Sequence, residues 1–173
     1  MSKATEMLTN EHKNILLAIA GLFNQCAKDE QSGAISHDFY QSEIDFIRNY
    51  ADKFHHAKEE DILFVELNKD SANPHCNPTE QMLYEHDLGR QYVKELATGL
   101  EINNLAGVLA GARGYGNLLK DHIYKEDNIL YPMADEALSQ EIKDKLLEKF
   151  ERIAREYSEA NQKYELFLSN LNK

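Results

Sequence analysis

The sequence is poor in the residues that cross-link or interrupt a chain. It has two cysteines, three prolines, eight glycines and no tryptophan in 173 residues. Cys26 and Cys76 are too few for a disulfide framework or a cysteine zinc site, so we expect two unreactive thiols. With few helix breakers, and with Ala, Leu, Glu and Lys common, the composition predicts an all-α protein.

Basic residues are also scarce, with 19 Lys and Arg against 30 acids and a net charge of −11. No Lys/Arg cluster is present to bind nucleic acid, and an anionic membrane surface would repel the chain. No apolar run is long enough to span a bilayer, and the first residues, "MSKATEMLTNEH", contain no signal-peptide core. We therefore expect a cytoplasmic protein with no nucleic-acid or membrane partner.

Helical periodicity and turn residues divide the chain into five helices. Ser36 is a suitable N-cap for the second helix, Pro78 suits the first turn of the third, and Pro132 is a stop signal after the fourth. The predicted helices cover about residues 5–28, 36–67, 78–99, 104–131 and 139–171.

Four helices joined by short connections predict an up-down-up-down antiparallel four-helix bundle. We assign the bundle to residues 1–135 and an additional C-terminal helix to residues 136–173. That last helix has an apolar stripe of its own. It is expected to pack on the bundle or on a partner subunit, which would make a homo-oligomer.

The chain contains an internal repeat of chemistry-bearing residues. "HHAKEEDILF" (55–64) aligns with "HIYKEDNILY" (122–131), and each follows a Glu-His pair, in "NEHKNI" (10–15) and in "YEHDLG" (84–89). The order Glu-His, then His-x-x-Lys-Glu, therefore occurs twice. The histidines and glutamates of the repeat are His12, His55 with Glu59, His86, and His122 with Glu126.

This spacing indicates a metal site. A His and a Glu four residues apart lie one turn apart on the same helix face, so both can reach one cation or two adjacent ones. Four bundle helices would then bring four imidazoles and two carboxylates to one level of the core. Such a set is too large for one closed zinc site and suits two metals bridged by the carboxylates.

Several nearby residues have weaker assignments. His56 is rotated about 100° from His55 on an α-helix, so we expect it beside the metal ligands, at the rim or on the surface. Glu11 and Glu85 would either orient histidines or lie on the surface. Glu60 and Asp127 are expected to be solvated neighbours, and His37 and His75 are given no role.

These motifs resemble those of the haemerythrin-like family, the HHE cation-binding domains, over roughly residues 8–133. The resemblance implies a non-haem di-iron centre in a four-helix bundle, bridged by two carboxylates and an oxygen from solvent. Zinc or manganese would be substitutes for the two iron ions. The implied iron ligands are His12, His55, Glu59, His86, His122 and Glu126.

The chain departs from the oxygen carriers of that family. Met82 stands where they have a further histidine, one turn before the third-helix ligand, which implies a more open iron. Their last motif is His-x-x-x-x-Asp, which Asp127 would satisfy, whereas the internal repeat favours Glu126. Tyr115 lies two turns before His122 and either donates a hydrogen bond to a bound oxygen species or is satisfied elsewhere in the core.

Three functions follow from these observations. The first is binding or sensing of a small diatomic, O2 or NO, by a di-iron centre. The second is catalytic: reduction of NO or peroxide, or repair of iron centres, with a redox partner supplying electrons. The third is a zinc-loaded structural or interaction module. In the fourth helix, Gly107 and Gly111 would let helices approach closely. Gly114 and Gly116 would open a bend or a ligand path above the metals, or the helix is bent with no functional role.

Overall fold

The computed structural model describes residues 1–69 and 78–171, and every regular element in these ranges is helical. This confirms the all-α prediction. His75 and Cys76 lie outside the described residues. The elements are α1 (Lys3–Ser32), α2 (His37–Phe46), η1 (Ile47–His56), η2 (Glu59–Leu63), α3 (Phe64–Leu67), α4 (Thr79–Glu101), α5 (Leu105–Lys125), η3 (Glu126–Leu130), α6 (Tyr131–Ala137), α7 (Gln140–Glu156) and α8 (Ser158–Leu171).

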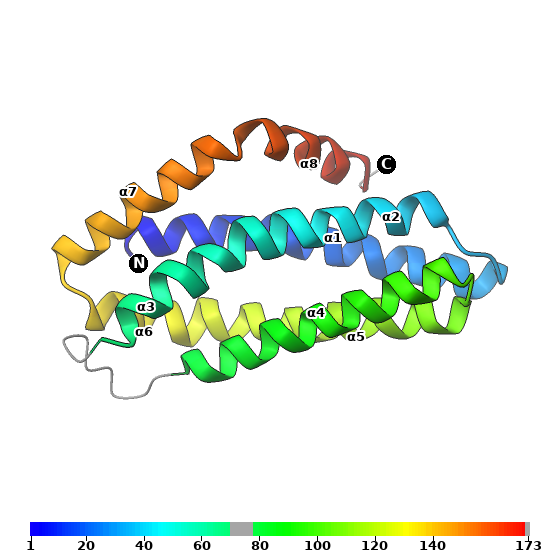
Figure 1. Ribbon diagram of the computed structural model, residues 1–173, viewed down its shortest axis with the longest axis horizontal. Coiled ribbons are helices and arrows are strands. Elements are labelled where there is room, and N and C mark those ends of the chain that lie inside the picture. The colour runs from blue at the N-terminus through cyan, green and yellow to red at the C-terminus, as the bar shows by residue number, and fades with distance from the viewer. Residues whose placement is uncertain (70–77, 172–173) are drawn as a thin grey trace.

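The long helices lie lengthwise beside one another in a bundle (Figure 1). α1 and α4 run in one direction in this view, and the rods from α2 to α3 and from α5 to α6 run in the other. α7 and α8 extend along one side of the bundle. No helix among the described residues is both long and apolar enough to cross a membrane.

Two of these rods change from α- to π-helical bonding at corresponding points of the repeat. The Phe64 amide donates to the Glu59 carbonyl, and the Tyr131 amide donates to the Glu126 carbonyl. A π turn contains one more residue than an α turn, and such turns are frequent at functional sites. The longer segment η1 precedes the first of them.

The π turns correct the predicted apolar face. On an unbroken α-helix, Ile62 and Ile129 would lie two turns after His55 and His122 on the same buried face, but Ile62 is only partly buried and Ile129 is 55% exposed. Leu63 and Leu130 are buried instead. The inserted residue of each π turn moves the inward face by one position.

Pro132 does not end the fourth helix, contrary to the prediction. It occupies the first turn of α6, directly after η3, and the rod continues to Ala137. A proline costs little at such a position because its missing N–H is not needed.

The core is divided into two apolar clusters with polar residues between them. One cluster contains Ile15, Phe54, Val93 and Leu119, and the other contains Leu8, Leu63, Met82 and Leu130, among others. In each long rod the chain passes from one cluster to the other within about two to three turns. The histidines of the repeat lie at these crossings.

The C-terminal segment is two helices rather than the single one predicted, because the backbone leaves helical geometry at Tyr157 (φ −95°, ψ 5°). Phe150 of α7 is buried in the same cluster as Leu8, and Tyr164 of α8 contacts the ring of Phe46. The break lets each half follow a different part of the bundle. The proposed domain boundary near residue 135 stays a prediction.

The glycines of α5 permit close packing rather than a bend. A Cβ on Gly111 would lie 2.5 Å from the backbone nitrogen of Leu96, and one on Gly114 would lie 2.4 Å from the ring of Tyr92. α5 is a regular α-helix throughout, and the rings of Tyr92 and Phe23 fill the space beside Gly114 and Gly116, so the predicted ligand path there is wrong. The predicted close approach at Gly111 is confirmed.

Candidate metal centre

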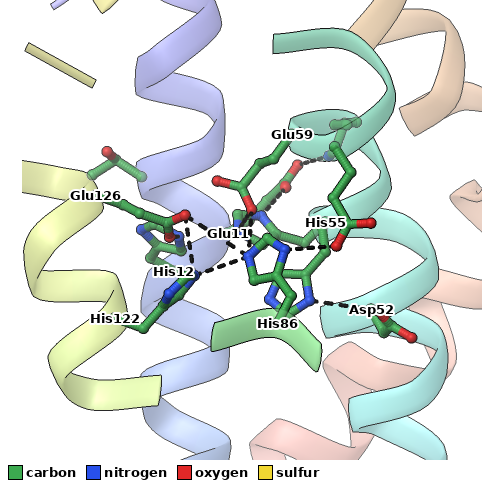
Figure 2. Close-up of polar contacts among 12 residues, drawn as sticks. Glu11, His12, Asp52, His55, Glu59, His86, His122 and Glu126 are labelled. Carbon is green, nitrogen blue, oxygen red and sulfur yellow. Dashed lines mark hydrogen bonds and ion pairs between the residues drawn. The ribbon is translucent and has the colours of Figure 1, made fainter. Parts of the chain in front are cut away.

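The six residues of the repeat come together in the middle of the bundle. All are at most 1% exposed, and they come from α1, η1, η2, α4, α5 and η3. Figure 2 shows the imidazoles gathered around the two carboxylates. Six ionisable side chains buried away from solvent are costly unless they are paired or hold cations.

Each histidine presents Nε2 to one of the two central carboxylates. The distances from Nε2 to Glu126 are 3.2 Å for His12 and 3.1 Å for His122. The distances from Nε2 to Glu59 are 3.6 Å for both His55 and His86.

The opposite nitrogen, Nδ1, of each histidine is held by a different carboxylate outside this centre. A carboxylate accepts hydrogen bonds only, so Nδ1 carries the proton and Nε2 is directed inward. This arrangement is the usual support of a metal-bound imidazole. The pairs are His55 with Glu11 (2.8 Å), His122 with Glu85 (2.8 Å), His86 with Glu60 (2.6 Å) and His12 with Asp127 (3.0 Å).

The repeat explains why glutamate precedes each single histidine. Glu11 accepts from His55 and from Lys58, and Glu85 accepts from His122 and from Lys125. The Glu-His pair of one helix therefore orients the His-x-x-Lys-Glu motif of another. Of the two placements left open for Glu11 and Glu85, the structure supports the orienting one.

The sequence predicted that Glu60 and Asp127 are solvated neighbours of the centre, but both also hold a histidine of the centre. Their carboxylates accept from Nδ1 of His86 and of His12, and both are only partly exposed. Asp127, which is 27% exposed, lies at the edge of the centre, whereas Glu126 is fully buried within it. This placement favours Glu126 over Asp127 as the inward-facing acid.

The two halves of the centre are geometrically equivalent. The ring centroids of His12 and His55 are 4.6 Å apart with an interplanar angle of 61°, and those of His86 and His122 are 4.7 Å apart with an angle of 62°. Two groups of four buried side chains could each hold an ion. They are His12, His55, Glu59 and Glu126, and His56, Glu59, His86 and His122.

His56 belongs to the second group, although its sequence position placed it beside the centre, at the rim or on the surface. It is 5% exposed, and its ring stacks on that of His86 at 3.9 Å. His55 and His56 lie in π-helical η1, where successive residues are rotated by less than on an α-helix. Both side chains can therefore reach the interior, a result that α-helical spacing could not anticipate.

Tyr131 was not singled out from the sequence. Its hydroxyl donates to Oε1 of Glu59 at 2.6 Å and lies 3.3 Å from Nε2 of His12. Its ring stacks on His12 just as the ring of Phe64, the equivalent residue of the repeat, stacks on His86. The only signal available was the difference between Phe64 and Tyr131 in two otherwise similar motifs.

Met82 and Tyr115 lie outside the two groups. Met82 is buried in the second apolar cluster, one turn before His86. Tyr115 is buried, and its hydroxyl has no hydrogen-bond partner within the described residues. The alternative that Tyr115 is satisfied elsewhere in the core is therefore not supported. His37 is not part of the centre: its Nε2 lies 2.9 Å from Oδ1 of Asn103.

The electrostatics of the centre favour a bound cation. Burial, followed by the charge of Glu126, raises the pKa of Glu59 well above its ordinary value. Burial alone would lower the pKa of His12 and of His122, but acids including Glu126 outweigh it and raise these values to about 9 and about 10. In the metal-free protein, protons on His12 and His122 therefore supply the positive charge that a bound metal would supply.

Three central oxygens test whether these residues fit a metal. Oε2 of Glu59 and both oxygens of Glu126 are buried and make no hydrogen bond of ordinary geometry within the described residues, and imidazole Nε2 atoms lie 3.1–3.6 Å from them. A buried carboxylate oxygen without a donor is expensive, and a cation is the partner that the surrounding Nε2 atoms can share. The donor set of imidazole and carboxylate fits two divalent ions.

The comparison with known families agrees with this chemistry. The model of the hemerythrin HHE cation binding domain family matches residues 3–134. No curated protein and no solved structure matches the chain at a significant level.

Proposed function

This chain belongs to the hemerythrin HHE cation binding domain family, and we propose that it is a non-haem di-iron protein that binds or senses a small diatomic molecule, O2 or NO. We further propose that its bundle has the up-down-up-down topology and that it works in the cytoplasm. The metal centre is the basis of the proposal, because no other group among the described residues brings three or more potential metal ligands together.

One observation carries the proposal. All four histidines of the repeat have Nδ1 anchored by a carboxylate and Nε2 directed at Glu59 or Glu126. A set of buried histidines that only filled the core would have no reason to share one orientation. The same orientation in two copies of a repeat is what two metal positions with shared carboxylates require.

The residues divide between two positions. The first would be held by His12 and His55 and the second by His86, His122 and His56, with Glu59 and Glu126 shared. Two ferrous ions so placed can supply electrons to a diatomic ligand. Tyr131 keeps a phenolic proton next to Glu59 because burial, and then the neighbouring acids, raise the pKa of its hydroxyl. The two apolar clusters exclude water on either side.

Metal content together with an optical spectrum tests this function. Protein purified without oxygen is expected to contain about two irons per chain and to gain an absorption band in the near ultraviolet and visible range when O2 or NO is added. A change that reverses when the gas is removed indicates binding. Turnover with a reductant would indicate the catalytic alternative, the reduction of NO or peroxide.

Two results would contradict the proposal. A colourless protein that retains only zinc would favour a structural or interaction module. A protein that binds no metal would leave the family membership in place and remove the di-iron function. Glu126→Gln is a matched variant, since it keeps the side-chain volume and removes one shared carboxylate. It is expected to lose iron at both positions.

A further inference from the structure

A cavity of about 140 Å³ lies directly outside the second half of the metal centre. Ile47 of η1 and Gly89 and Val93 of α4 form its walls, and His56 and His86 form its inner end. The exposed side chains of Arg48 and Lys94 stand at its edge, so it is open to solvent. The volume is enough for several waters or for one molecule of up to about six heavy atoms.

Tyr115 of α5 places an unpaired hydroxyl at this cavity. Tyr115 is 2% exposed and lines the cavity, yet its hydroxyl makes no hydrogen bond within the described residues. Burial, followed by the charges of Glu43 and Asp52, raises the pKa of this hydroxyl well above 10, so it keeps its proton. It is a buried donor in need of an acceptor, and a molecule in the cavity can supply one.

The inner end of the cavity has a second buried polar atom that makes no hydrogen bond. Nδ1 of His56 is buried and makes no hydrogen bond, and its nearest acid, Asp52, is 3.5 Å away. Asp52 already accepts from Nη2 and Nε of Arg90 at 2.7 and 3.0 Å. Because a carboxylate only accepts, Nδ1 of His56 carries the proton, and without a hydrogen bond of its own it can donate to a molecule in the cavity.

The charge around the cavity is opposite to that of the chain. Arg48, Arg90 and Lys94 line it, against the single carboxylate of Asp52. Arg90 is committed to Asp52, Glu60 and Asp87, whereas Arg48 and Lys94 form no ion pair in the described part of the chain. Two uncommitted cations at the opening, in a chain of net charge −11, attract anions locally.

From these features we propose that the cavity binds a small inorganic anion of the size of nitrite, between the Tyr115 hydroxyl and the His56 imidazole. A neutral diatomic would not satisfy two donors and two cations, and a cation would be repelled. Organic acids with more than about six heavy atoms exceed the volume. The site is separate from the metal positions, since His56 and His86 stand between them, and it does not depend on the proposed di-iron function.

Nitrite titration followed by amide NMR tests the proposal. The protein is loaded with zinc, which is diamagnetic and cannot reduce nitrite; if the chain takes up no metal, the metal-free protein is used. Nitrite is expected to shift the amides of Ile47, Gly89 and Val93 in a saturable way. Tyr115→Phe should weaken binding about tenfold, because it removes one hydrogen bond to a charged acceptor.

A second variant, with two exposed cationic side chains replaced, tests the contribution of charge to binding. The double variant Arg48→Gln with Lys94→Gln should weaken binding about tenfold at low salt and less at high salt. The matched control is Lys149→Gln with Arg152→Gln on α7, which makes the same change in net charge away from the cavity. It should leave the nitrite affinity unchanged within about twofold.

Three outcomes overturn the proposal. They are no saturable shift at the cavity amides, the same affinity in all variants, and shifts confined to the metal-bound histidines, which would place the anion on the metals. Because the charge variants alter only exposed side chains, they remain informative if Tyr115→Phe does not fold. Iron content, measured on protein purified separately without added zinc, reports on the di-iron function.

Discussion

At the scale of single residues, His56 and Tyr131 distinguish the two halves of the metal centre. The equivalent positions in the repeat hold Ile123 and Phe64. His56 adds a third imidazole to the group of His86 and His122. Tyr131 instead adds a hydroxyl beside His12. The two metal positions therefore have different surroundings although the helices around them repeat.

The difference predicts unequal effects of two neighbouring histidines. His55→Ala should reduce the metal content from two ions per chain toward one, since it removes an anchored ligand of the first position. His56→Ile, which copies the other half of the repeat, should retain two ions at saturating metal but change the spectrum of the second. Elemental analysis and Mössbauer spectroscopy of iron-loaded protein measure both. Equal metal loss in the two variants, or an unaltered spectrum for His56→Ile, would contradict the assignment.

Protons on the histidines predict a pH dependence of metal affinity. The folded, metal-free chain has pKa values of about 9 for His12 and about 10 for His122, above the ordinary 6.5. A metal needs both Nε2 atoms unprotonated, so binding at pH 7 should release these two protons. Affinity should rise with pH by up to about 100-fold per unit from pH 7 to 9 and level off above pH 10.

Calorimetric titration with zinc in buffers of different ionisation enthalpy measures the released protons directly. The stability of the metal-free fold depends on pH in the opposite direction to the metal affinity. The raised pKa values of His12 and His122 stabilise that fold fully below pH 6.5, and the effect is lost as the pH rises through 9 and 10. Release of no protons at pH 7 would show that these imidazoles are neutral before metal binds.

At the scale of helices, the contact of α4 with α5 depends on small residues. Gly99 and Gly111 let the two backbones approach closely, since a Cβ at either position would lie within 2.7 Å of a backbone nitrogen of the facing helix. The close approach sets the separation of His86 on α4 from His122 on α5. Their Nε2 atoms are 3.0 Å apart.

Gly111→Ala is therefore expected to be destabilising. The added Cβ would lie 2.5 Å from the Leu96 backbone, which must move. The expected loss is about 1–3 kcal/mol, as for other overpacked sites. Gly89→Ala on α4 is the control, because its Cβ would meet side-chain atoms no closer than 3.4 Å. It should be neutral or stabilising by up to about 1 kcal/mol. Urea unfolding of both variants measures this, and equal stability would contradict the packing argument.

At the scale of the whole molecule, a charged layer separates two apolar clusters. Glu59 and Glu126 are wholly buried within this layer, and the clusters on either side are joined through the same four rods. Without metal, the imidazolium forms of His12 and His122 partly balance the acids. Metal should thus stabilise the whole bundle and not only its centre.

Metal removal is expected to lower the melting temperature. At a free metal concentration 1,000 times Kd, each site contributes about 4 kcal/mol. A domain of this size changes its Tm by about 2–4 °C per kcal/mol. Chelation should therefore lower the Tm by roughly 10 °C or more, and returning the metal should restore it. Glu126→Gln is the control, since its Tm should respond little to chelation. If chelation left the Tm of the wild-type protein unchanged, this would contradict a contribution of the metals to stability.

The sequence alone determined the helical class, the family resemblance and the six inward residues. The helical class follows from composition and periodicity, and the six residues follow from the spacing of His and Glu within both copies of the repeat. It did not determine His56, the exposure of Ile129 or the continuation past Pro132. All three depend on π turns, whose extra residue is stabilised by tertiary contacts and has no local sequence signal.

The tertiary structure alone decided how the surrounding acids are used. Glu60 and Asp127 look like ordinary charged residues of a helix surface, and only the approach of another helix brings His86 and His12 to them. The same holds for Tyr131, whose hydroxyl meets Glu59 from another rod. Periodicity tells which face of a helix is inward. Partners across helices depend on the separation and rotation of whole rods, and these are set by the packed bundle.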